Sequence, residues 1–105
     1  MVDYGLKDKV VIVTGTNNPW GIGAATAYAF AREVAKYGIT VNCIAPGPTQ
    51  TGWIDAEFEK VVVPMIPMGK LIQPQDIAET ILFLASEQAH MITGQVLKVS
   101  GGKSL

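Results

Sequence analysis

Three glycines near the start of the chain could form a phosphate-binding loop. The run Val10–Thr14 (VVIVT) is β-branched, as in a parallel strand buried on both faces, and Gly15, Gly21 and Gly23 follow it. Gly15 would allow a sharp turn. Gly21 and Gly23 would let the backbone approach a pyrophosphate, which the N-terminus of the next helix attracts. The alternative is a tight strand-to-helix turn that binds no ligand.

A second turn follows the apolar run Ile39–Ala45 (ITVNCIA). The sequence Pro46-Gly47-Pro48 should end this strand, because proline cannot donate a hydrogen bond to a strand ladder. From the residues alone, this segment is a strand-terminating turn.

Few other side chains have the partners that catalysis or metal binding needs. His90 has no Cys, Asp or second His at ligand spacing, so we expect no metal site. Cys43 has no neighbouring base, which disfavours a nucleophile, and a single cysteine excludes an internal disulfide. Trp20 and Trp53 flank the two loops and could wall a ligand or make exposed or oligomer contacts.

The elements that position these residues alternate between strand and helix. Strands are expected at about 10–14, 39–45 and 95–100, and helices at about 21–37, 55–63 and 74–88. This order predicts an α/β fold with a three-stranded parallel sheet and right-handed crossovers.

Two of the predicted helices carry an apolar stripe. Gly38 should end the first, and Pro74 suits the first turn of the last. The first stripe contains Ile22, Ala25, Ala29, Phe30, Val34 and Tyr37. The last stripe contains Ile77, Ile81, Leu84 and Ala85.

Composition narrows the function classes. The 105 residues fit one domain (1–105), and 49% hydrophobic residues argue against disorder. The net charge of −1 is made of 8 basic and 9 acidic residues spread along the chain, so we expect no nucleic-acid or membrane partner. No signal core is recognised, and we expect a cytoplasmic protein.

Three segments together resemble the short-chain dehydrogenase/reductase family. LKDKVVIVTG…GIGAATAYAFARE is similar to its first strand, glycine motif and first helix. EVAKYGITVNCIAPGPTQT is similar to the end of its fifth helix, its sixth strand and the loop beyond. MGKLIQPQDIAETILFLASEQAHMITGQVLKVSGG is similar to its last helix and strand. The nearest types are bacterial 3-oxoacyl-carrier-protein reductases and glucose dehydrogenases.

The resemblance implies a truncated Rossmann-like three-layer fold with a long internal deletion. The segments AYAFARE and REVAKYG appear joined within one helix, and everything between the family's first helix and the end of its fifth is absent. The glycine motif also differs, since the family pattern is T-G-x-x-x-G-x-G and two extra residues stand between Gly15 and Gly21 here.

The missing part carries the family's chemistry. The family reaction uses a tyrosine as general acid/base, a lysine four residues later and a serine that holds the substrate oxygen. This chain has no Tyr-x-x-x-Lys; Tyr28 and Arg32 share the spacing, but Tyr28 stands only ten residues before Gly38, about half the family's separation. We expect Tyr28 to face solvent. The serines at 86, 100 and 104 lie where the family has no catalytic serine.

The resemblance also implies a weak site for NAD or NADP. The Pro46-Gly47 backbone and the Thr51 side chain would meet the nicotinamide end, with Thr49 beside them. The residue that selects between the two cofactors is absent, and Lys70 stands where the family often has a basic residue near the substrate. The predicted cofactor-binding residues are Gly15, Thr16, Asn17, Gly21, Ile22, Gly23, Pro46, Gly47, Thr49 and Thr51.

The deletion sets conditions for folding. The first strand must lie beside strand 39–45, and the fused helix can cover only one face of the sheet, which leaves helix 74–88 or another chain to cover the other. Glu33 falls inside the predicted apolar stripe and must reach solvent near the helix end or find a partner. Exposed sheet edges favour a homo-oligomer, and the alternative is a compact three-layer domain.

Three functions are compatible with these features. The family is one of NAD(P)(H)-dependent oxidoreductases acting on a carbonyl or alcohol, but without the Ser and Tyr-x-x-x-Lys we expect this chain to be inactive. The alternatives are a minimal dinucleotide- or phosphate-binding module, and a structural deletion product with no ligand.

Overall fold

The computed structural model describes residues 10–13 and 21–103. The predicted site residues Gly15, Thr16 and Asn17 and the side chain of Trp20 lie outside this part. The strands are β1 (Val10–Val13), β2 (Thr40–Pro46) and β3 (Val96–Val99). The α-helices are α1 (Ile22–Val34), α2 (Ala56–Val62) and α3 (Pro74–Leu84), followed by 3₁₀ turns η1 (Ala35–Tyr37), η2 (Val63–Met65) and η3 (Glu87–Ala89).

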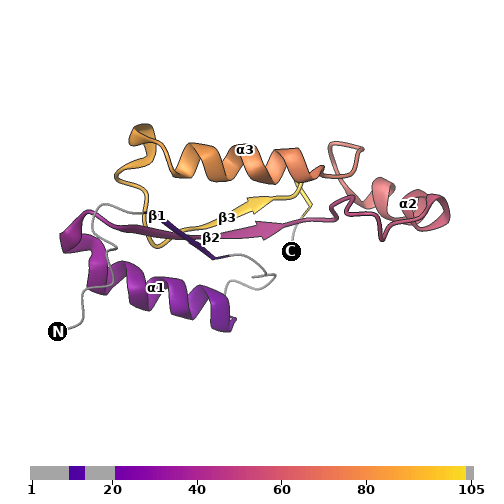
Figure 1. Cartoon of the computed structure of the whole chain (residues 1–105). Helices are drawn as coiled ribbons and strands as arrows, with labels where there is room; N and C mark the ends of the chain where they lie inside the picture. The colour runs from indigo at the N-terminus through magenta and orange to yellow at the C-terminus, as the bar shows by residue number, and fades with distance from the viewer. Residues whose placement is uncertain (1–9, 14–20, 104–105) are drawn as a thin grey trace.

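The three strands form one parallel sheet in the order β1-β2-β3 (Figure 1). Val13 of β1 pairs with Cys43 of β2, and Cys43 also pairs with Val96 of β3. Thr40 to Ala45 are all buried, as expected for a central strand covered on both faces. The predicted pairing of the first strand with strand 39–45 is confirmed.

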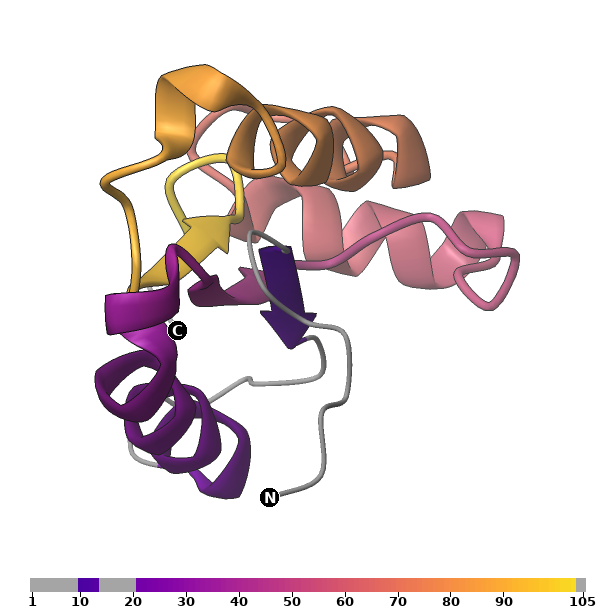
Figure 2. The same cartoon turned by 60° about the vertical axis from the view of Figure 1, so that its left-hand side comes forward.

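Helices α1 and α3 cover opposite faces of this sheet (Figures 1 and 2). Helix α1 packs against Val41 and Cys43, whereas Leu84 of α3 lines a pocket with Thr40, whose side chain points to the other face. The predicted three-layer arrangement is confirmed. However, the chain moves in the same direction across the sheet from β1 to β2 and from β2 to β3. Because α1 and α3 lie on opposite faces, these two crossovers have opposite hands. The prediction that both are right-handed is wrong.

A different face of α1 from the predicted one packs on the sheet. The buried residues are Ala24, Ala27 and Ala31, while Ile22 is 88% exposed and Phe30 is 54% exposed. Alanines carry only a Cβ, so they allow the helix axis to approach β2 closely. The predicted stripe is therefore wrong for its exposed members, Ile22, Ala25, Ala29, Phe30 and Tyr37.

The ends of α1 and α3 have local causes. Gly38 adopts φ +74°, which confirms it as the stop of the first helix. Glu33 is exposed, as its charge requires. Helix α3 ends at Leu84, before the predicted residue 88, because the Ser86 amide and hydroxyl both donate to the Phe83 carbonyl and the backbone turns extended at Ser86.

The α2 segment projects beyond the end of the sheet (Figure 1). The helix begins at Ala56 and is capped by Asp55, whose carboxylate accepts a 2.8 Å hydrogen bond from the Phe58 amide. A second small hydrophobic core joins the end of α2 to the segment before α3 and contains Val62, Ile66, Leu71 and Ile72. In the described part of the chain, none of the helices combines the length and apolar character needed to span a bilayer.

Candidate functional site

The described parts of the two predicted loops both lie along β2. The Pro46–Thr51 segment leaves β2 at its carboxyl end, and Gly23, at the start of α1, contacts Cys43 of the same strand. Ligands of open parallel sheets bind outside the carboxyl ends of the strands. The fold therefore places the N-terminus of α1 and the Pro46–Thr51 segment along the carboxyl-terminal half of β2.

The N-terminus of α1 is the described part of the glycine loop. Gly21 precedes the helix in an extended conformation and its carbonyl accepts from the Ala25 amide at 3.0 Å. The first amides of a helix have no intrahelical acceptor, and the first turn of α1 has no acidic side chain. This terminus thus presents N–H donors and a positive dipole end, with Ile22 exposed beside them.

The start of α1 is fixed against β2. The Cys43 thiol lies 3.6 Å from the Gly23 carbonyl oxygen, to which it donates a weak hydrogen bond. Gly47 is four residues farther along the chain, about 13 Å at the usual rise per strand residue. The candidate site is therefore elongated, with the glycine turn at one position and the Pro-Gly turn well beyond it.

Gly47 attaches the second loop to β3. Its amide donates to the Val99 carbonyl at 2.9 Å. A Cβ at position 47 would lie 2.9 Å from both Cα and Cβ of Ser100 and 3.3 Å from the side chain of Ile72. Only glycine therefore allows this close packing of the turn on the end of β3.

Thr49 and its neighbours hold the rest of this loop. The Thr49 hydroxyl donates to the Gly47 carbonyl at 2.8 Å, and Thr49 forms a parallel bridge with Ile72. The Gln50 amide donates to the Ile72 carbonyl, and the Ile72 amide donates to the Pro48 carbonyl. Thr51 is exposed at the end of the segment and is available to a ligand.

Gln50 and Ile72 were missed by the sequence analysis. The Gln50 side chain accepts from the Gly52 amide and donates to the Ile54 carbonyl, each at 3.0 Å, and so shapes the turn after Thr49. Ile72 is more than twenty residues away in the chain. The one local signal for the role of Gln50 is a glutamine directly after the turn Pro46-Gly47-Pro48-Thr49.

The residues with possible catalytic spacing lie elsewhere. Tyr28 is 42% exposed and lines a groove with Arg32 and Gly94, between α1 and the turn that precedes β3. The expected solvent-facing position of Tyr28 is confirmed. Ser100 is buried beneath Gly47, and Ser86 donates to the Phe83 carbonyl, so neither presents a free hydroxyl at the sheet edge.

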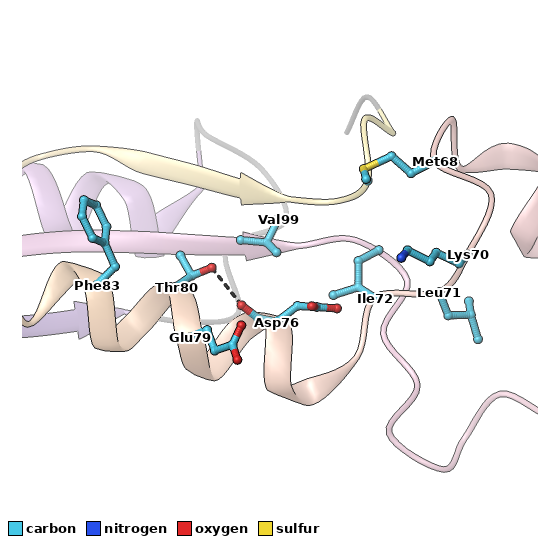
Figure 3. Close-up of a pocket in the computed structure, with 10 residues that line it drawn as sticks. Met68, Lys70, Leu71, Ile72, Asp76, Glu79, Thr80, Phe83 and Val99 are labelled. Carbon is cyan, nitrogen blue, oxygen red and sulfur yellow. Dashed lines mark hydrogen bonds between the residues drawn. The ribbon is translucent and has the colours of Figure 1, made fainter.

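A cleft of about 540 Å³ lies between α3, the end of β3 and the loop before Ile72 (Figure 3). Lys70, Asp76 and Glu79 contribute charge, while Phe83 and Val99 are among its apolar walls. Asp76 is already engaged, because its carboxylate accepts from the Gln73 amide at 2.8 Å. No three His, Cys, Asp or Glu side chains of the described residues are grouped so as to hold a metal ion.

Comparisons with known proteins identify relatives of this chain. The family model described as enoyl-(acyl carrier protein) reductase matches residues 21–104. The oxidoreductase YjdA of Bacillus subtilis is 43% identical over 82 residues, which are 76% of this chain and 33% of that protein. A 3-oxoacyl-(acyl-carrier-protein) reductase, FabG of Rickettsia felis, is 47% identical over 73 residues, 67% of this chain and 30% of its own length.

Solved structures match more of the chain. A hydroxysteroid dehydrogenase from Escherichia coli superimposes with a TM-score of 0.79 and 30% identity, covering 91% of this chain and 46% of that one. A 3-ketoacyl-(acyl-carrier-protein) reductase from Brucella melitensis, complexed with NADH, gives a TM-score of 0.75 and 30% identity over 91% and 44% of the two chains. The chain spans about a third of the length of the curated relatives it matches. It is a truncated member of the short-chain dehydrogenase/reductase family.

Proposed function

We propose that this chain is a minimal dinucleotide-binding module that holds NAD or NADP and does not transfer hydride. The observation that carries the proposal is that the N-terminus of α1 and the Pro46–Thr51 segment both lie along the carboxyl-terminal half of β2. One contributes the N-terminus of α1 for the pyrophosphate. The other contributes the backbone of Pro46 and Gly47 and the side chains of Thr49 and Thr51 for the nicotinamide end. The NADH complex of the similar Brucella melitensis reductase supports this choice of ligand.

The backbone N–H groups at the N-terminus of α1 suit a diphosphate better than a neutral ligand. The first turn of the helix has no carboxylate to compete with an anion, and Gly21 and Gly23 present no side chain there. The dipole of α1 adds a favourable interaction that is typically about 0.3–1 kcal/mol at an exposed helix end. A module of this kind binds weakly because it has few walls around the ligand.

The proposal that this chain does not transfer hydride rests on the missing acid/base group. The sequence contains no Tyr-x-x-x-Lys, and Tyr28, the residue nearest to that pattern, is partly exposed on α1 beside Arg32. Oxidoreductase activity on a carbonyl or alcohol belongs to the family, and this chain keeps the cofactor half of that machinery.

A titration with cofactor tests the proposal. Isothermal calorimetry with NADH and NADPH, together with a thermal melt followed by far-UV circular dichroism, should show binding and a Tm that rises with cofactor concentration. A cooperative melt that ignores millimolar cofactor would contradict the binding proposal and favour a ligand-free structural module. Cofactor oxidation with carbonyl substrates should stay at the buffer rate.

Association of two chains through the outer edges of β1 and β3 stays a prediction. Each of these two strands pairs only with β2 among the described residues, so its outer edge has no described strand neighbour. Light scattering coupled to size-exclusion chromatography, repeated over a range of protein concentrations, measures the mass in solution and decides between monomer and oligomer.

A further inference from the structure

Helix α2 and the following turn η2, which we call the α2 arm, carry an exposed apolar stripe. Phe58, Val61 and Met65 are each between 53% and 61% exposed. Their spacing of three and four residues places them on one face of the arm. Val62 is buried in the second hydrophobic core and holds the arm in place. An exposed apolar face bordered by polar residues is typical of an interaction site.

Carboxylates border this stripe. Glu57 and Glu59 stand on either side of Phe58 in the chain, and at about 100° per residue they project to opposite sides of the stripe. Both are exposed. Glu57 lies 3.5 Å from Lys60, whereas Glu59 forms no ion pair with any described residue. The arm therefore presents an apolar face with acidic borders.

A second apolar surface is the α1 groove, with a volume of about 450 Å³, between α1 and the turn that precedes β3. Its lining residues are Tyr28, Ala31, Arg32, Ala35, Thr93 and Gly94. Alanine and glycine make up half of this lining and leave room for a large side chain from outside. Tyr28 adds an aromatic wall.

Basic side chains border the groove. Arg32 lines it, and Lys36 follows one turn later, so both lie on the same side of the helix. Both are exposed, and neither forms an ion pair with a residue of the described part of the chain. Glu33 is also exposed but does not line the groove. The charge beside the α1 groove is thus opposite to that of the α2 arm.

The arm and the groove lie at opposite ends of the sheet. The Gly94 amide donates to the Val41 carbonyl at 2.8 Å, which places the α1 groove beside the start of β2. The α2 arm follows the carboxyl end of the same strand and projects away from it (Figure 1). The seven residues of β2 span about 20 Å at the usual rise per residue, so the arm does not reach the groove of its own chain. An arm that enters the groove must come from another molecule.

We propose that the α2 arm of one chain docks in the α1 groove of a second copy, head to tail. Phe58 enters the apolar groove while the carboxylates of the arm face Arg32 and Lys36, in the way that an amphipathic helix binds a groove. Such an interface is heterologous, so further chains can add unless the rotation closes a ring. This association needs neither a dinucleotide nor pairing between sheet edges.

Sedimentation equilibrium of the whole chain tests the association. The helix of the arm has only seven residues, so the interface falls below the roughly 1,200 Å² of a standard complex and binds weakly. The measurement therefore extends from micromolar to millimolar protein. The mean mass of the wild type should rise with concentration beyond that of one chain.

Two variants identify the surfaces. Phe58→Ser removes the largest apolar side chain of the stripe, and Arg32→Glu reverses the charge at the groove. Each should raise the dissociation constant by about tenfold or more. An equimolar mixture of the two should form a 1:1 dimer that grows no further, because one chain keeps an intact groove and the other an intact arm. Far-UV circular dichroism checks that each variant is folded.

Leu82→Ser is the matched control, because Leu82 is a 68% exposed apolar residue of α3, outside both surfaces. This variant should associate as the wild type does. Val61→Ser repeats the test of the arm if Phe58→Ser does not fold.

Four results would each overturn the proposal. They are a wild type that stays monomeric up to millimolar concentration, folded arm and groove variants that associate as strongly as the wild type, and a mixture of the two that forms no dimer. The fourth is a loss in Leu82→Ser as large as in Phe58→Ser, which would place the contact on α3.

Discussion

Gly47 packs on Ser100 with no room for a side chain, since a Cβ at position 47 would lie 2.9 Å from two Ser100 carbon atoms. This contact and the 2.9 Å hydrogen bond from Gly47 to Val99 together fix the direction in which the second loop leaves β2. The position of the Pro-Gly turn therefore depends on the last strand, although the turn itself follows the central one.

Gly47→Ala should lower the free energy of unfolding by about 1–3 kcal/mol, because the methyl group overlaps backbone and Cβ atoms that cannot move freely. Urea unfolding followed by circular dichroism measures this. The double variant Gly47→Ala with Ser100→Gly should recover part of the loss, since one of the two clashing atoms is gone. A Gly47→Ala variant as stable as the wild type would contradict the close packing.

Ile22→Glu should separate stability from ligand binding. Ile22 is 88% exposed in the first turn of α1, so the change loses little packing, and the new carboxylate stabilises the helix by about 0.3–1 kcal/mol. The same charge repels a pyrophosphate, and we expect NADH affinity to fall about tenfold. That factor corresponds to about 1.4 kcal/mol.

The uncharged variant Ile22→Gln serves as the control in the same calorimetric titration and should bind NADH nearly as the wild type does. Equal affinities for the Glu and Gln variants would show that no phosphate lies at the N-terminus of α1.

A pair of leucine substitutions checks which face of α1 meets the sheet. Ala27 is 1% exposed against β2, so Ala27→Leu should cost about 1–3 kcal/mol through overpacking. Ala25 is exposed on the same helix, and Ala25→Leu should change stability by less than about 0.5 kcal/mol. Urea denaturation of both proteins measures the difference, and the reverse order would restore the stripe expected from the sequence.

Asn42 links β2 to the chain that enters β3. Its side chain is fully buried, donates to the Ile92 carbonyl at 3.0 Å and accepts from the Gln95 amide at 3.1 Å. Asn42→Ala leaves both backbone groups unpaired and should lower the free energy of unfolding by about 2–4 kcal/mol.

Gln95→Ala is the matched control, because the Gln95 side chain makes only an exposed bond to the Thr93 carbonyl. Its thermal melt should stay within about 2 °C of the wild type. A comparable loss in both variants would mean that the Asn42 side chain does not bridge these backbone groups.

The strands were predictable because their signal is local. The β-branched run at 10–14, the apolar run at 39–45 and the predicted strand at 95–100 lie within two residues of β1, β2 and β3. The stripe on α3 was also largely right, with Leu84 buried and Ile77 and Ile81 partly buried. Proline or glycine beside an apolar run is a strong boundary signal in each of these elements.

The orientation of α1 was not predictable from periodicity. This helix has two apolar faces, one of alanines at 24, 27 and 31 and one that includes Ile22 and Phe30. Hydropathy predicts that the face with the larger side chains is buried. Close approach of the helix to the strand instead favours burial of the face with the smaller side chains. Packing decides between the two faces, and packing is a tertiary property.

The hand of the crossovers and the pairing of Thr49 with Ile72 also depend on distant parts of the chain. Crossovers between parallel strands of one sheet are almost always right-handed, and this rule predicts two right-handed crossovers here. The fold instead covers both faces of β2 with single helices, which buries the central strand. In the candidate site, the Pro46–Thr51 loop was predicted, but its attachment to Ile72 has no signal near residue 49. The contributions of Gly15, Thr16 and Asn17 stay predictions.

The attachment of β1 to a single described neighbour has a consequence for the order of folding events. β2, β3 and the helices α1 and α3 can assemble around one another, while β1 adds its ladder from outside and can detach at a lower free energy than the whole domain. A dinucleotide bound at the N-terminus of α1, beside the end of β1, would act first on this local equilibrium. Its earliest trace in hydrogen exchange would be slower exchange of the amides shared by β1 and β2, before any change in the rate at which the rest of the molecule opens.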